Sequence, residues 1–114
     1  MNLTGKCKED FEKWYELNYE TIGLRSFYLA EFYELPETMQ YGVYVDFFDS
    51  VKMNIIIERR TQNLYLFVIY FSNYYGSGDI PNKQTRPEAR TAAIEKANEL
   101  YNLKQIKLKY YDNN

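Results

Sequence analysis

The sequence predicts a small α+β protein in which helices pack on an antiparallel β-hairpin or a three-stranded sheet. With 114 residues the chain is long enough to bury one hydrophobic core, so we expect a single domain over residues 1–114. Two neighbouring segments are rich in β-branched and aromatic residues, and several others show the apolar spacing that is typical of helices. The predicted order is helix, short helix, helix, strand, strand, helix, with a final strand in the three-stranded form.

The first predicted helix covers residues 2–20, with Asn2 as its N-cap. The apolar residues of one face recur at steps of three or four: Leu3, Cys7, Phe11 and Trp14. Because Cys7 falls on this apolar line, we interpret it as a small core residue and not as a nucleophile. Residues 24–34 carry too many aromatic side chains for one face, and they predict a short helix or an irregular segment packed on the core.

Residues 35–50, LPETMQYGVYVDFFDS, predict a helix that lies between the first helix and the sheet. Pro36 and Glu37 suit a first helical turn. The apolar residues recur at every fourth position: Leu35, Met39, Val43 and Phe47. The competing prediction is a strand, since Val43 and Val45 also alternate with their neighbours and Gly42 is a poor helix former. We favour the helix because its start and its charged end suit it better.

The strand-like segments are residues 51–59 and 64–71, joined by residues 60–63 into a hairpin. Three consecutive isoleucines favour a strand in the first segment. The second segment, LYLFVIYF, is apolar or aromatic on both faces, which is typical of a strand that is covered on both faces. We therefore expect either helices on both sides of the sheet or a partner chain that closes one side.

The C-terminal part begins with a polar loop over residues 72–84, followed by a helix from residue 85. Thr85, Pro87 and Glu88 match a capping box with proline in the first turn. A face of small residues could lie close against the sheet: Ala89, Ala93 and Ala97. In the tail over residues 103–114, isoleucine, leucine and tyrosine alternate with lysine, which predicts a third strand at the sheet edge.

Composition narrows the function classes. The aromatic fraction is 18%, with 13 tyrosines and seven phenylalanines, which predicts an aromatic core with tyrosines at its rim or, alternatively, a tyrosine-rich binding surface. The net charge is −2, but residues 1–50 carry a net −6 and residues 51–114 a net +4. The absence of histidine excludes Ser–His and Cys–His catalysis and the common zinc sites. With no signal-type or membrane-spanning apolar run, we expect a soluble protein in the cytoplasm.

The strongest catalytic candidates are the carboxylates of Asp46 and Asp49. Three residues apart on a helix, they would share a face and could hold a magnesium ion together with water and phosphate oxygens. Alternatively, they are solvated, pair with the arginines of the following hairpin, or cap a backbone amide. We favour these alternatives, so we predict no resident metal or cofactor and lean towards a protein that is not an enzyme.

A second candidate site is a basic patch for nucleic acid, with tyrosines as stacking rings. Its residues are Arg59, Arg60, Lys83, Arg86, Arg90, Tyr74 and Tyr75. Single-strand binders need basic and aromatic residues together, but these are scattered along the chain. The acidic overall charge also argues against a dedicated nucleic-acid binder.

Three segments, residues 2–15, 35–50 and 85–102, together resemble a family of short uncharacterised proteins in phages and prophages of gut-type Bacteroidota and related bacteria. The likeness covers about two thirds of the chain, with the segments in the same order. The resemblance implies a phage or mobile-element context, and small proteins of such origin often inhibit host defence. It implies no activity and no site residues.

These observations lead to the hypothesis of a non-enzymatic, phage-type binding protein that contacts a host protein or a small ligand in the host cytoplasm. An anti-defence inhibitor is one form of it, and a homodimer through the sheet is a further expectation. A nucleic-acid-associated accessory protein and a metal-dependent enzyme that uses Asp46 and Asp49 are the two alternatives.

Overall fold

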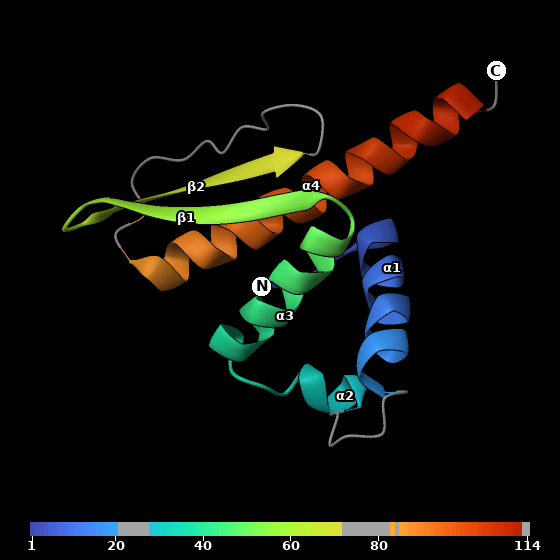
Figure 1. Cartoon of the computed structure of the whole chain (residues 1–114), viewed down its shortest axis with the longest axis horizontal. Coiled ribbons are helices and arrows are strands. Elements are labelled where there is room, and N and C mark those ends of the chain that lie inside the picture. The colour runs from blue at the N-terminus through green and yellow to red at the C-terminus, as the bar shows by residue number, and fades with distance from the viewer. Residues whose placement is uncertain (21–27, 72–82, 84, 113–114) are drawn as a thin grey trace.

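The computed structural model describes residues 1–20, 28–71, 83 and 85–112, and it confirms the predicted α+β fold and the order of its elements. The helices are α1 (Gly5–Tyr15), α2 (Leu29–Phe32), α3 (Glu37–Ser50) and α4 (Arg86–Asp112), and the strands are β1 (Met53–Thr61) and β2 (Leu64–Phe71). A π-helical segment, η1 (Glu16–Glu20), continues α1. Figure 1 shows α4 running across the hairpin, while α3 and α1 lie side by side next to it.

The strands form an antiparallel hairpin in which Ile55 lies opposite Ile69 and Ile57 opposite Phe67. Helices α3 and α4 pack against one face, where the buried residues are Met53, Ile55, Phe67 and Ile69. On the opposite face, the Ile56 side chain is 45% exposed. Within the described residues, helices therefore cover one face of the sheet and not both. Closure of the other face by a partner chain stays a prediction.

The start of α1 differs from the prediction. The helix begins at Gly5, whose φ of +61° places it in the left-handed region that glycine adopts without steric cost. The N-cap is therefore Thr4 and not Asn2, and no side chain of its own turn caps the helix. Instead, Asn102 of α4 accepts the Cys7 N–H with Oδ1 at 2.8 Å. The α1 terminus is thus completed by a residue far away in the sequence.

The helical prediction for residues 35–50 is confirmed over Glu37–Ser50, and the strand alternative is wrong. The buried face of α3 differs from the predicted apolar stripe. Met39 belongs to that stripe, but its side chain is 53% exposed. The buried residues of α3 are Gln40, Tyr44, Phe47 and Phe48. The Gln40 Nε2 donates to the carbonyl oxygens of Tyr33 at 3.1 Å and Leu35 at 3.0 Å. The polar side chain of Gln40 can be buried because these hydrogen bonds satisfy both its amide group and the backbone carbonyl groups that precede α3.

The predicted third strand is wrong. Helix α4 has 27 residues and continues through Asp112, so the tail joins the helix and not the sheet. Residues 103–112 contain neither glycine nor proline. Adding a residue to an existing helix gains a hydrogen bond without a new nucleation cost, so a short alternating stretch does not end it. Among the described residues, the sheet consists of the strands β1 and β2, and an isolated bridge joins Tyr65 to Lys83.

The core is aromatic, and its centre is Phe11. The Phe11 side chain is fully buried, and its ring centroid lies 5.0 Å from that of Tyr44, 5.4 Å from Phe32 and 5.5 Å from Phe47. Burial also raises the pKa of the Cys7 thiol to about 12, which fits its interpretation as a core residue.

Tyrosines at the core rim direct their hydroxyl groups to carboxylates. The Tyr33 hydroxyl donates to Glu12 at 3.0 Å, and the Tyr101 hydroxyl donates to Asp10. Burial and these carboxylates together raise the pKa of both phenols, which keeps them neutral and able to donate. The prediction of an aromatic core rimmed by tyrosines is thus confirmed for these residues.

Tyr44→Phe should raise the free energy of unfolding by about 1 kcal/mol. The Tyr44 hydroxyl is buried without a hydrogen-bond partner among the described residues, so the phenylalanine ring keeps the packing and removes a desolvated polar group. Urea unfolding measures the change. Tyr33→Phe is the matched control, and it should lower the free energy by about 1 kcal/mol because its hydroxyl is paired. A loss of stability in Tyr44→Phe as large as in the control would contradict the prediction.

Candidate functional site

Asp46 and Asp49 lie in the last turns of α3, and both are exposed. The Asp46 Oδ2 accepts a long hydrogen bond of 3.5 Å from the Tyr19 hydroxyl. The Asp49 Oδ1 accepts a hydrogen bond of 3.0 Å from the Asn54 side-chain amide. Among the described residues, no group of three or more Cys, Asp or Glu side chains could hold a metal ion. The pair therefore has neighbours that fit a structural role, although not the predicted arginine partners.

The hairpin arginines are exposed and turn back onto their own strand. The Arg60 guanidinium forms a salt bridge of 3.2 Å with Glu58. The Arg59 Nε donates to the Thr61 carbonyl oxygen at 3.3 Å, next to the register irregularity between Arg59 and Thr61. Arg60 is thus neutralised within the strand, whereas Arg59 is paired with a neutral carbonyl.

The other two predicted arginines stand over tyrosine rings. The Arg86 guanidinium lies 5.3 Å from the ring centroid of Tyr65, and the Arg90 guanidinium lies 5.4 Å from that of Tyr41. Both distances are within the range of a cation–π contact. We call Tyr41, Tyr65, Arg86 and Arg90 the arginine–tyrosine cluster.

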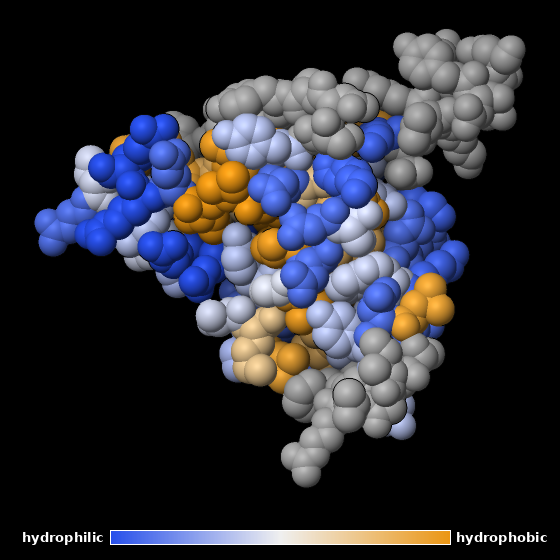
Figure 2. All heavy atoms as spheres, viewed as in Figure 1, coloured by the Kyte–Doolittle hydropathy of each residue, from blue (hydrophilic) through white to orange (hydrophobic). Residues whose placement is uncertain are grey.

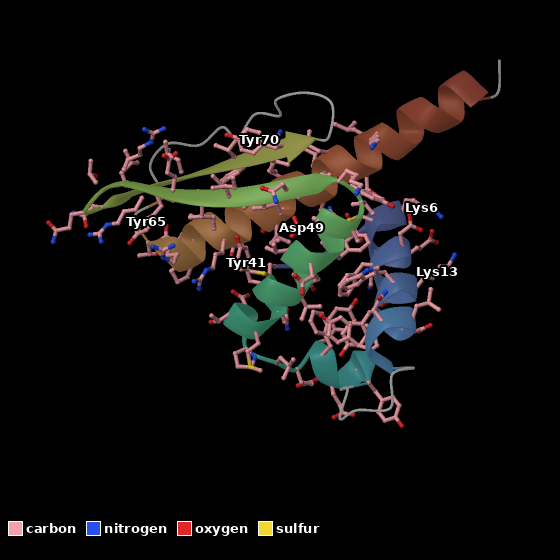
Figure 3. All side chains as sticks on the ribbon, in the orientation of Figure 1. Lys6, Lys13, Tyr41, Asp49, Tyr65 and Tyr70 are labelled. Atoms are coloured by element: carbon pink, nitrogen blue, oxygen red, sulfur yellow. The ribbon has the colours of Figure 1, made fainter. Side chains whose placement is uncertain are left out.

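Three elements of the fold build this cluster. The capping residue Thr85 starts α4, because its Oγ1 accepts the Glu88 N–H at 3.3 Å, as the capping-box motif predicts. The hydroxyl of Thr85 also lies 3.0 Å from the Glu88 carboxylate. Arg86 and Arg90 follow one helical turn apart on the same side of α4. Figure 3 shows Tyr41 on α3 and Tyr65 on β2, each beside the first turns of α4.

The strand register adds further basic residues next to the cluster. Arg59 of β1 lies directly opposite Tyr65 of β2. The Tyr65 N–H donates to the Lys83 carbonyl oxygen at 2.9 Å, which places residue 83 alongside β2. The fold thus brings Arg59 and the backbone of Lys83 close to Tyr65, the ring over which Arg86 lies. The sequence identified the basic residues but not that they lie together.

The arginines of the cluster carry charge that the described residues do not neutralise. No carboxylate of the described chain lies within salt-bridge distance of Arg86 or Arg90. Burial raises the pKa of Tyr41 from its ordinary value, and the charges of Arg90 and Arg86 oppose that rise. Both guanidinium groups therefore act on the phenol of Tyr41.

A hollow of about 380 Å³ lies beside the cluster, between the start of α3 and the first turns of α4. Its lining includes three carboxylate residues, Glu37, Glu88 and Glu95, and one cation, Lys83. The Glu37 carboxylate is 3.2 Å from the amino group of Met1. None of the four cluster residues lines this hollow. The cluster therefore lies outside this hollow.

Sequence reasoning missed both rings of the cluster. The predicted stacking tyrosines, Tyr74 and Tyr75, lie outside the described residues. Tyr41 and Tyr65 lie on other elements than their arginines, and no local motif links them. The alternation of β2 places Tyr65 on a particular face, but only the packing of α4 brings an arginine to it.

Comparisons with known protein families, with characterised proteins and with solved structures found no match to this chain. No helix in the described part of the chain is long and apolar enough to cross a membrane.

Proposed function

We propose that this chain is a non-enzymatic binding protein that contacts a partner protein through the arginine–tyrosine cluster. The observation that carries the proposal is the pair of guanidinium groups that lie over tyrosine rings and form no salt bridge with the described residues. Arginine and tyrosine are enriched in protein interfaces and dominate their binding energy. A host protein is the partner that the resemblance to phage proteins suggests, and an anti-defence inhibitor is one form of this function.

The exposed surface of the hairpin carries both apolar and hydrophilic areas. Figure 2 shows apolar atoms over the middle of the hairpin and hydrophilic atoms at its turn end. The exposed Ile56 lies on the face of the sheet opposite to the one that Arg59 and Tyr65 share, so it does not adjoin the cluster. Support for a protein partner therefore comes from the arginine and tyrosine side chains themselves. The acidic candidates, Asp46 and Asp49, accept side-chain hydrogen bonds, and this arrangement gives no support to a catalytic role.

Nucleic acid is the second candidate, because guanidinium groups without carboxylate partners also suit phosphate. Two observations favour a protein over nucleic acid as the partner. Each ring of the cluster has a guanidinium over one face, which leaves at most one face for a base, and the chain carries a net charge of −2. Stacking of successive bases needs free ring faces, and phosphate binding needs a net positive surface.

A paired affinity capture tests the proposal. The tagged wild-type protein, an Arg86→Gln/Arg90→Gln variant and a Lys8→Gln/Lys13→Gln control are each incubated with a host lysate, before and after nuclease treatment. The control removes the same charge from exposed positions of α1. We expect one or more proteins whose recovery falls at least about tenfold in the cluster variant but not in the control.

Circular dichroism of all three proteins shows whether they are equally folded. Equal recovery with the cluster variant and the control would contradict the proposed surface. Loss of the captured protein after nuclease treatment would favour the nucleic-acid alternative instead.

A further inference from the structure

We propose that the arginine–tyrosine cluster recognises carboxylate groups, so that the partner contacts it with an acidic segment. This inference rests on the proposed function and names the chemistry of the partner. It begins from the fact that the cluster presents cations that the described chain leaves unpaired. Three other described cations pair with carboxylates inside the chain: Lys6 with Asp10 at 3.2 Å, Arg60 with Glu58 at 3.2 Å, and Lys96 with Glu99 at 3.5 Å. Others, such as Lys8 and Lys13, also form no salt bridge among the described residues. The cluster differs from them because tyrosine rings hold its guanidinium groups.

The rings hold the guanidinium groups ready for an incoming anion. A guanidinium carries five N–H donors in its plane, and a ring against its face leaves those edge donors open. Contact with Tyr65 and Tyr41 limits the rotamers of Arg86 and Arg90, so less side-chain entropy is lost when an anion binds. A carboxylate accepts two parallel N–H groups from one guanidinium, and this bidentate geometry gives both strength and orientation.

The surroundings of the cluster favour separate carboxylates over a continuous phosphate chain. Glu88 lies on α4 between the two arginines in sequence, and Glu37 and Glu95 line the hollow with it. A polyanion that extends from the cluster over the neighbouring hollow would meet these three carboxylates, since phosphates follow one another at every nucleotide. A protein segment can place a glutamate or aspartate at each arginine and a neutral side chain beside the hollow.

The structure also indicates which residues decide affinity. Arg86 is exposed and Arg90 is half-buried, so both can be reached from solvent. Tyr65 and Tyr41 act as positioning residues, because they touch the arginines and carry no charge that an anion would seek. Removal of a ring should therefore weaken binding while the charge of the cluster stays the same.

Titration with defined anions tests this inference. The probes are a ten-residue peptide in which glutamate alternates with serine, the same peptide with glutamine, a twelve-residue oligothymidylate and inorganic phosphate. The arginine Nε–H signals of the ¹⁵N-labelled protein report binding. With the glutamate peptide, we expect saturable chemical-shift changes at Arg86 and Arg90. Binding of this peptide should weaken about tenfold when the salt concentration rises from 50 to 500 mM. With the glutamine peptide, we expect no chemical-shift changes.

The variants separate charge from positioning. Arg86→Gln and Arg90→Gln should each lower the affinity for the glutamate peptide at least about fivefold. Tyr65→Leu should lower it about threefold, and Lys8→Gln/Lys13→Gln should lower it less than about twofold. Equal binding of the glutamate and glutamine peptides, or shifts that do not respond to these variants, would overturn the inference. Tighter binding of oligothymidylate than of the glutamate peptide would overturn it in favour of nucleic acid.

The glutamate peptide also serves as a competitor in the affinity capture, which keeps the two proposals distinct. If a protein is captured through the cluster and the peptide does not displace it, the proposed function stands and the acidic partner is wrong. If the peptide binds the cluster but no protein depends on the cluster for capture, the proposed function fails while the anion preference remains.

Discussion

Replacing Phe11 with alanine should lower the free energy of unfolding by about 4 kcal/mol. The Phe11 side chain is fully buried in α1, and its ring contacts Phe32, Tyr44 and Phe47 from α2 and α3. Alanine would leave a cavity where three elements meet, because helices held by other contacts collapse only in part. Since a domain of this kind has a total stability of about 5–15 kcal/mol, the variant should be close to unfolding.

Urea unfolding followed by the fluorescence of Trp14 measures this loss directly. Trp14 is the only tryptophan of the chain, and its ring lies 5.9 Å from that of Phe11. Phe11→Leu should cost about 1–2 kcal/mol, because it refills most of the volume. Met39→Ala, at an exposed apolar site, should stay within about 0.5 kcal/mol of the wild type. If Phe11→Ala cost no more than Phe11→Leu, Phe11 would not be the centre of the core.

Much of the fold could be predicted because its elements carry local signals. The isoleucine run predicts β1, the Thr85 capping box predicts the start of α4, and the start at Pro36 predicts α3. Each signal lies within about one turn or one strand of the element that it specifies. The predictions that fail depend on distant contacts or on competition between patterns. The exposed Met39 is an example, since the packing of α3 against β1, α4 and α1 decides which face of α3 is buried.

The candidate site could be predicted only in part for the same reason. The sequence identified Arg59, Arg60, Arg86 and Arg90 as basic candidates, but their carboxylate and aromatic neighbours come from the tertiary structure. Internal pairing with Glu58 removes Arg60 from the set of free cations. Packing of α4 on β2 and α3 supplies the rings for Arg86 and Arg90. Two arginines of the predicted basic patch, Arg86 and Arg90, therefore belong to the arginine–tyrosine cluster.

Asn102→Ala should lower the free energy of unfolding by about 2 kcal/mol, the second largest effect that we expect. The Asn102 Oδ1 accepts the Cys7 N–H at 2.8 Å, and its Nδ2 donates to the Thr4 carbonyl oxygen at 3.0 Å. The Thr4 side chain does not cap α1, so this asparagine supplies the acceptor that an N-cap residue usually provides. Its removal leaves a partly buried amide unpaired and loosens α1 from α4.

Two variants and a local measurement distinguish capping from general packing. Asn102→Asp keeps an acceptor for Cys7 and places a negative charge near the start of α1, so it should recover about half of the loss. Asn98→Ala removes hydrogen bonds to Thr4 that are exposed to solvent, and it should cost about 1 kcal/mol or less. Hydrogen exchange of the Cys7 amide should accelerate in Asn102→Ala. If that amide keeps its protection while stability falls, the asparagine stabilises the fold through packing with α1 and not as its cap.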